Sequence, residues 1–290
     1  MKRLSLSNII IALILGIGAI ITVFPFYQTL MLSFSTILDK KAGGIFLFPK
    51  SFDFSSYIYI FNEGKVTQGI YISVIVTIVG TLVSMLITTA GAYALSKKGM
   101  PGRNIIFTGI VFTMFFSGGL IPFYLTIQKL HLQNNLLVMI LPVAVNAFNL
   151  ILMKNFFSTI DPAIEESAKI DGANDIRILF RIIVPISLPI IATMTLFYAV
   201  DRWNEWWLPM LFINDTSLQP LQLILRDAIT NLSQSLTNTT GAQLAAGVQS
   251  VYADSVKSAM IIVSAVPILM IYPFVQKYFN AGIMMGSVKG

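Results

Sequence analysis

The sequence contains no cysteine and only one histidine, His131. The absence of cysteine excludes disulfide bonds, thiolate metal sites and cysteine nucleophiles, and a single histidine cannot build a histidine metal cluster. Charge is also scarce, because 11% of the 290 residues are Asp, Glu, Lys or Arg, whereas 56% are hydrophobic. The composition therefore excludes most soluble-enzyme motifs and indicates a membrane protein.

Apolar runs of about 20 residues, long enough to cross a bilayer as helices, recur along the chain. The sequence predicts six spans, which centre on Ile9–Leu32, Gly69–Leu95, Ile105–Ile127, Leu136–Phe157, Ile183–Leu211 and Ala259–Phe279. The first run is too long for the apolar region of a signal peptide, and no small-residue cleavage site follows it closely, so we interpret it as a retained span. The expected fold is one all-α polytopic membrane domain over residues 1–290.

If successive spans cross the membrane in opposite directions, many of the basic residues lie on the same side of it. They are Lys2, Arg3, Lys97, Lys98, Arg103, Lys154, Lys169, Arg177 and Arg181. The positive-inside rule then predicts that both termini and residues 158–182 are cytoplasmic, and that the polar segments 35–67 and 214–257 are extracellular. The basic residues form no stripe on one face, which disfavours nucleic-acid binding.

Ionisable side chains are missing from the interiors of the second, third, fourth and sixth predicted spans. Proton-driven transporters need an ionisable relay near the midplane, and a membrane-embedded hydrolase needs a nucleophile with a base or a pair of aspartates. A GxxxxGK[ST] phosphate-binding loop is absent as well. We therefore expect no catalytic residue, no metal and no cofactor on this chain, and energy for uphill transport must enter from another protein.

A polar block, EESAKIDGANDIRILF from Glu165 to Phe180, interrupts the apolar sequence on the predicted cytoplasmic side. Just before it, Asp161 is a suitable N-cap and Pro162 fits the first helical position, so we expect a short helix that runs to about Ile170. Gly172 can adopt the left-handed conformation that ends a helix.

A second short helix is expected from about Asn174. It would place three apolar residues on one side, namely Ile176, Phe180 and Ile183. Such a helix–turn–helix block either docks a partner protein or is an ordinary loop against the lipid headgroups. The residues alone leave both interpretations open.

The same block resembles the EAA signature of permease subunits of ATP-binding-cassette importers, which runs E-A-A, three residues, G, nine residues, I-x-L-P. Here Glu166–Ala168 is followed after three residues by Gly172, and after nine more by Ile182–Pro185. Serine stands for the first alanine and valine for the leucine. The string Glu166–Ala173 is closer still to the version found in sugar importers.

Further stretches extend the resemblance over nearly the whole chain. Phe116–Asn135, Phe148–Phe157 and Val200–Arg226 look like the carbohydrate uptake transporter family 1, and within it like the second permease of importers of polysaccharide-derived oligosaccharides. The resemblance implies the type I importer fold with six core helices. The partners that it implies are a second permease, two copies of a cytoplasmic ATPase that binds ATP and Mg, an extracellular solute-binding protein and the oligosaccharide.

By the same resemblance, the polar block contains the coupling helix that sits in a groove of the ATPase. The residues that it assigns to this role are Glu166, Ser167, Ala168, Asp171, Gly172 and Ala173. Glu166 would bond to the ATPase surface, Asp171 and Gly172 would set the turn, and Ala173 would allow close approach.

The fifth predicted span ends in AVDRWNEWWLPML, where Asp201 and Glu205 are four residues apart and share a helix face. Aromatic faces pack on sugars, and carboxylates and amides bond to hydroxyls, so this segment suits a neutral or weakly charged saccharide. The candidates for a substrate path are Asn146, Asn149, Asp201, Trp203, Asn204, Glu205 and Trp206. An aromatic belt at the outer interface remains an equal interpretation for 201–207, and interhelical hydrogen bonding for the two asparagines.

Together these features predict a non-enzymatic permease subunit of an ATP-driven, binding-protein-dependent importer of oligosaccharides that works by alternating access. The alternatives are a permease for a non-sugar solute and, in another class, a channel or membrane enzyme. The expected place is the cytoplasmic membrane of a bacterium, and the cysteine-free, Lys- and Ile-rich composition favours a Gram-positive one. Residues 214–257 would form either a loop that contacts the binding protein or pore, or a polar connector.

Overall fold

The computed structural model of the chain describes residues 6–35, 47–49, 51–62, 64–237, 254–271 and 273, and every regular element among them is a helix, as the sequence predicts. The bounds are α1 Leu6–Ser33, α2 Ser55–Asn62, α3 Lys65–Ser96, α4 Arg103–Phe115, α5 Leu120–Lys129, η2 Leu136–Met139, α6 Ala147–Phe157, α7 Pro162–Ile170, α8 Asp175–Ile178, η3 Leu179–Ile183, α9 Val184–Ile186, α10 Leu188–Trp203, α11 Trp207–Phe212, η4 Thr216–Leu218, α12 Leu221–Thr237 and a last helix, Asp254–Ile271.

The described residues fall into two compact units, one drawn from residues 1–67 and 224–267 and the other from 68–223 and 268–290. The single membrane domain that the sequence predicts stays a prediction. Parts of both segments predicted to be extracellular, residues 36–46 and 238–253, lie outside the described residues.

The first unit contains α1, α2, most of α12 and most of the last helix. Apolar side chains are exposed on every side of α1, which suits a helix surrounded by lipid or by other helices. At the end of α1, the hydroxyls of Ser33 and Tyr57 pair at 2.7 Å, and those of Ser35 and Ser255 at 3.2 Å. These bonds hold the end of α1 against α2 and the last helix.

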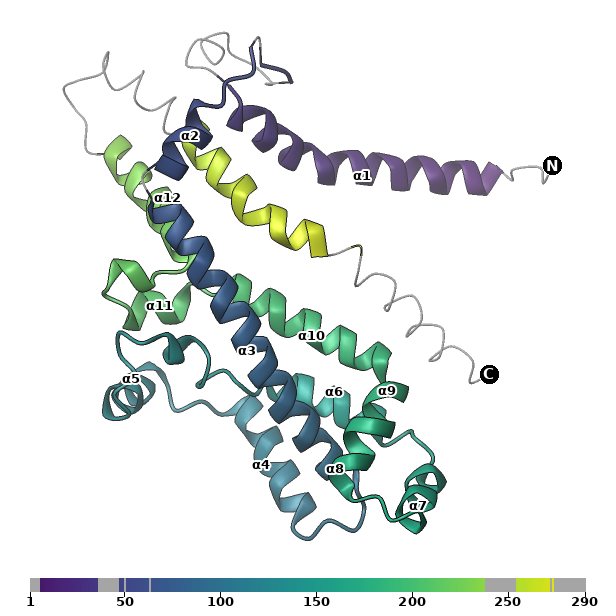
Figure 1. Ribbon diagram of the computed structural model, residues 1–290. Helices are drawn as coiled ribbons and strands as arrows, with labels where there is room; N and C mark the ends of the chain where they lie inside the picture. Colours follow the sequence, from purple (N-terminus) through teal and green to yellow (C-terminus); the bar gives the residue numbers. More distant parts are fainter. Residues whose placement is uncertain are drawn as a thin grey trace. The chain divides into compact units, whose positions relative to one another are not determined.

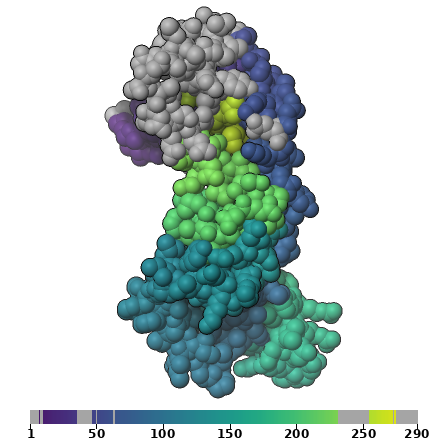
Figure 2. Space-filling model, turned by 90° about the vertical axis from the view of Figure 1, so that its left-hand side faces the viewer, coloured from purple at the N-terminus to yellow at the C-terminus, as the bar shows by residue number. Residues whose placement is uncertain are grey.

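In the second unit, α3 connects two cores, one near each of its ends (Figure 1). The first core joins α3 to α5, η2 and α11 through Ile72, Val76, Ile127, Val138, Met139, Ile140, Leu208, Phe212 and Ile213. The second joins it to α6, α7, η3 and α10 through Ala92, Tyr93, Met153, Phe157, Ala168, Ile178, Leu179, Ile183 and Met194. Figure 2 shows one face of this unit, where the teal segment with η2 lies against the green segment with α11.

Among the described residues, three helices are long and apolar enough to cross a membrane by themselves, namely Ile10–Ser33, Lys65–Ser96 and Asp254–Ile271. They correspond to the first, second and sixth predicted spans. Of the sixth span, residue 272 and the residues from 274 onward lie outside the described part of the chain.

The third and fifth predicted spans are bent pairs of helices. α4 and α5 meet at 118°, and the helices over 175–186 and 188–212 meet at 90°. With each pair taken as one span, the described part of the chain has up to five spans that are long and apolar enough to cross a membrane. The first break follows from Gly119, the N-cap of α5, because its φ of 85° is one that residues with a side chain rarely adopt. Pro185 and Pro189 favour the second break, since proline lacks the N–H that a helix needs.

The fourth predicted span, Leu136–Phe157, is not one helix, and the prediction of a continuous span is wrong here. It consists of η2, a non-helical stretch at residues 140–146, and α6. Pro142 disfavours helix before it. The α6 helix begins afresh because Asn146 caps it, with its side-chain oxygen accepting the Asn149 N–H at 3.2 Å.

Candidate functional site

The first candidate site is the docking block, which we define as residues 161–183. Its first helix, α7, begins as predicted: the Asp161 carboxylate accepts the Ala163 N–H at 3.0 Å, and Pro162 occupies the first turn. The helix ends with Gly172 at a φ of 81°. A residue without a β-carbon is favoured at this φ, so the sequence signal for the turn is confirmed.

The second helix of the docking block also begins where the sequence predicts. The Asn174 side chain accepts the Arg177 N–H at 2.8 Å and caps α8, which continues as a π-helix, η3. The expected apolar face is wrong in one respect: Ile176 and Phe180 are 70% and 47% exposed, but Ile183 is buried. The wider π-helical turn changes which residues share a face.

The residues that the EAA resemblance assigns to ATPase coupling differ in how exposed they are. Glu166, Ser167, Asp171 and Gly172 are exposed, and Ala173 is half-buried. Ala168 is buried in the second core of the unit. Four of the assigned residues are therefore accessible at the surface, whereas Ala168 packs inside and anchors the helix.

One functional candidate that the sequence argument did not single out is Glu165. Its carboxylate forms an ion pair with Lys97 and accepts a hydrogen bond from the Tyr93 hydroxyl at 3.4 Å. The only sequence signal is spacing, because Glu165 precedes the buried Ala168 by three positions and so shares its helix face.

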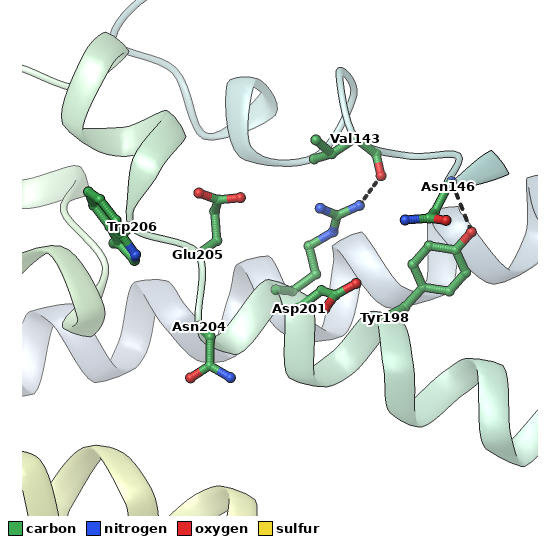
Figure 3. Close-up of a pocket in the computed structure, with 8 residues that line it drawn as sticks. Val143, Asn146, Tyr198, Asp201, Asn204, Glu205 and Trp206 are labelled. Atoms are coloured by element: carbon green, nitrogen blue, oxygen red, sulfur yellow. Dashed lines mark hydrogen bonds between the residues drawn. The ribbon is translucent and has the colours of Figure 1, made fainter. Parts of the chain in front are cut away.

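The second candidate site is a polar cavity of about 360 Å³ in the second unit (Figure 3). Its lining comes from the end of α10, the turn that follows it and the stretch before α6, and consists of Val143, Asn146, Tyr198, Asp201, Arg202, Asn204, Glu205 and Trp206. Five predicted substrate-path residues meet there, namely Asn146, Asp201, Asn204, Glu205 and Trp206. The other two, Asn149 and Trp203, do not line the cavity and are buried, at 3% and 6% exposure.

Arg202 is the cation of this cavity and is 5% exposed. Its Nη2 donates to the Ser84 hydroxyl at 3.2 Å and to the Val143 carbonyl, a bond that Figure 3 marks. The guanidinium packs on Gly80, where a β-carbon would lie 3.1 Å from Arg202 Nε. Arg202 thus joins α10 to α3 and to the wall before α6.

Tyr198 is a second wall residue that the sequence argument missed. Its hydroxyl lies 2.7 Å from the Thr88 hydroxyl and accepts the Asn146 backbone N–H at 3.1 Å. Tyr198 lies about one helical turn before Asp201 on α10, and Arg202 directly follows Asp201. Their closeness to Asp201 in the sequence is the signal that could have found them.

The side chains of two other lining residues, Glu205 and Asn204, already form hydrogen bonds within the chain. The Glu205 carboxylate accepts the N–H groups of Trp207 and Leu208 at 2.8 and 3.0 Å, which starts α11. The Asn204 side-chain oxygen accepts from Gln222 at 3.3 Å. Within the described residues, no three His, Asp or Glu side chains come close enough to hold a metal ion. The cavity thus combines carboxylates, amides, a guanidinium and an indole, a set suited to a polyhydroxylated ligand.

Replacing Tyr198 with Phe should lower the stability of the second unit by about 1–3 kcal/mol, because the part-buried Asn146 N–H and the buried Thr88 hydroxyl lose their partner. The measurement is the thermal unfolding midpoint of the purified protein in detergent. Tyr71→Phe is the matched control, since Tyr71 is 61% exposed on the same helix as Thr88. Equal midpoints for both variants would show that the Tyr198 hydroxyl carries no net stabilisation.

Comparison with known proteins places the chain among transport proteins. Residues 89–285 match the family described as binding-protein-dependent transport system inner membrane component. The chain is 41% identical over 272 residues to the polygalacturonan/rhamnogalacturonan transport system permease protein YtcP of Bacillus subtilis (strain 168), and 94% of each chain is covered. It is 42% identical over 275 residues to protein LplC of the same organism, which covers 95% of this chain and 92% of LplC.

A solved structure shows the same fold. One chain in the crystal structure of a bacterial ABC transporter involved in the import of the acidic polysaccharide alginate is 33% identical, with a TM-score of 0.85. The match covers 96% of this chain and 100% of that one. The likeness therefore extends over the residues of both compact units.

Proposed function

This chain belongs to the family of binding-protein-dependent transport system inner membrane components, and we propose that it is the second permease subunit of an ATP-driven oligosaccharide importer. Two copies of a separate cytoplasmic ATPase bind ATP and Mg, a second permease completes the pathway, and an extracellular solute-binding protein delivers the sugar. The chain lies in the cytoplasmic membrane of a Gram-positive bacterium with both termini inside. The distribution of basic residues and the similarity to Bacillus subtilis proteins support this arrangement.

The observation that carries the proposal is the surface of the docking block. Ile170 and Ile176 are 87% and 70% exposed on either side of the Gly172 turn, close in sequence to the exposed carboxylates of Glu166 and Asp171. Exposed apolar side chains with charged residues beside them are more stable in a groove of another protein than in contact with water. The ATPase fits as its occupant, because the sequence has no phosphate-binding loop of its own.

We assign the polar cavity to the sugar pathway. The named relatives include a permease for polygalacturonan or rhamnogalacturonan and an importer of the acidic polysaccharide alginate, so acidic oligosaccharides such as oligogalacturonides are the proposed substrates. Arg202 contributes guanidinium N–H donors that suit a carboxylate, and Asn146, Asn204 and Trp206 contribute amides and an aromatic face for the ring.

Reconstitution tests this function directly. The chain, its partner permease, the ATPase and the binding protein are placed in proteoliposomes, and uptake of labelled trigalacturonate is followed with and without ATP. We expect uptake that needs both ATP and the binding protein. Failure of the chain to retain an ATPase on gentle solubilisation, together with absent uptake, would overturn the proposal. ATP-dependent uptake of a neutral oligosaccharide in place of trigalacturonate would overturn only the substrate class.

Trp206→Ala should raise the apparent KM for trigalacturonate about fivefold, because one aromatic contact contributes about 1 kcal/mol. Trp207→Ala is the matched control: its ring lies 5.7 Å from that of Trp206 in an edge arrangement, but Trp207 does not line the cavity. Initial rates of uptake at several sugar concentrations measure both. If the two variants change KM equally, the pair forms an interfacial belt and Trp206 is no sugar contact.

A further inference from the structure

The two adjacent glutamates of the docking block face different environments. Glu166 is exposed, whereas the side chain of Glu165 is 14% exposed and forms an ion pair with Lys97, which is 32% exposed. The Lys97 ammonium also lies 4.0 Å from the centre of the Tyr93 ring, and the Tyr93 hydroxyl donates to Glu165 at 3.4 Å. Glu165, Lys97 and Tyr93 thus form a closed cluster, which we call the clamp.

The clamp joins α7 to the end of α3. Tyr93 lies in the last turn of α3, and Lys97 follows that helix directly. The end of α3 is itself held, because Arg103 Nε donates to the Leu95 carbonyl at 2.7 Å. A partly buried ion pair with an aromatic partner holds its geometry more firmly than an exposed pair.

An apolar contact lies one turn further along α7. Ala168 is buried in the same core as Ala92 and Tyr93 of α3. Two contacts a turn apart prevent α7 from pivoting about either one. α7 is therefore fixed in orientation relative to α3, and a displacement of the docking block moves the end of α3 with it.

The same helix reaches the polar cavity. Counting back from Tyr93, the α3 residues Thr88 and Ser84 contact the cavity wall: Thr88 bonds Tyr198 at 2.7 Å, and Ser84 accepts from Arg202 at 3.2 Å. By contrast, the route along the chain from α7 to α10 crosses the Gly172 turn, a π-helix and a 90° bend. Such breaks absorb motion rather than transmit it.

We propose that the clamp is the positioning device that transmits movement of the docking block through α3 to the walls of the polar cavity. The inference rests on the proposed function, because it takes the docking block to be moved by an ATPase. Glu165, Lys97 and Tyr93 contact neither ATP nor sugar. Their role is to couple ATP hydrolysis to transport.

Charge exchange in the complete importer tests the clamp. Lys97→Ala and Glu165→Ala should each lower the number of trigalacturonate molecules imported per ATP hydrolysed about tenfold, with the ATPase still bound. The double variant Lys97→Glu with Glu165→Lys should return that ratio to within about twofold of the parent. A double-mutant comparison of this kind isolates the pair from its surroundings.

The matched control is Lys98→Ala, one residue beyond Lys97 and outside the docking block. Lys98 is exposed, so loss of its charge should leave the ratio unchanged. An equal loss in Lys98→Ala and Lys97→Ala, or no rescue by the charge exchange, would overturn the inference. A parallel fall in uptake and ATP hydrolysis, with the ratio constant, would overturn it as well.

A second measurement needs no sugar. Because the chain has no cysteine, spin labels on Lys98→Cys and Ala163→Cys report one distance between the end of α3 and α7. We expect the same narrow distance distribution in the nucleotide-free and vanadate-trapped states, and a broad one after Glu165→Ala. A narrow distribution in Glu165→Ala would overturn the clamp while leaving the proposed function intact. Failure of the ATPase to bind the parent chain would instead overturn the proposed function.

Discussion

Gly172→Val is expected to lower binding-protein-stimulated ATP hydrolysis of the assembled importer about tenfold or more. Gly172 has a φ of 81°, which a β-branched residue adopts only at a cost of about 1–3 kcal/mol. The strain would be relieved by opening the turn between α7 and α8. That opening would break the bond from the Ala173 N–H to the Ala168 carbonyl at 3.0 Å and misplace the docking surface.

The control for this prediction is Gly172→Asn at the same position. Asparagine tolerates the left-handed conformation, so this variant should keep most of the stimulated activity. A β-carbon at Gly172 would have no neighbour within 4 Å, so steric collision does not confuse the comparison. Equal activity of the valine and asparagine variants would show that the turn conformation is irrelevant to ATPase coupling.

Arg202→Met should abolish most sugar uptake and lower the free energy of unfolding by about 3 kcal/mol. The variant leaves the part-buried Val143 carbonyl and the buried Ser84 hydroxyl without their charged donor, and such bonds contribute about 1.5–3 kcal/mol each. The cavity also loses its cation. Thermal unfolding in detergent and uptake of trigalacturonate in proteoliposomes measure the two effects.

Arg202→Lys separates the effects of charge and geometry. Lysine keeps the positive charge but lacks the planar fork, so it should retain part of the stability and little of the uptake of a carboxylate-bearing sugar. Gly80→Ala gives an independent view, because its β-carbon would lie 3.1 Å from Arg202 Cδ and Nε and displace the guanidinium. Unchanged uptake in Arg202→Met would remove the guanidinium from the sugar pathway.

The docking block was largely predictable from the sequence, and the cavity only in part. The sequence signals of the docking block are local. Asp161 caps a helix that starts at the next residue, and Gly172 occupies a position whose positive φ favours glycine. The cavity depends on contacts across the chain. Arg202 reaches a carbonyl 59 residues away, and the Tyr198 hydroxyl accepts an N–H from 52 residues away.

The sequence by itself determined the membrane class and the helix–glycine–helix turn at Gly172. Composition and helix ends depend on residues within a few positions of one another, which a sequence displays directly. Tertiary structure alone decided that Glu165 turns inward while Glu166 stays exposed, that Leu136–Phe157 is broken, and that Arg202 joins the cavity wall to α3. Those outcomes follow from packing between distant segments, because burial and hydrogen-bond partners exist only once the helices have met.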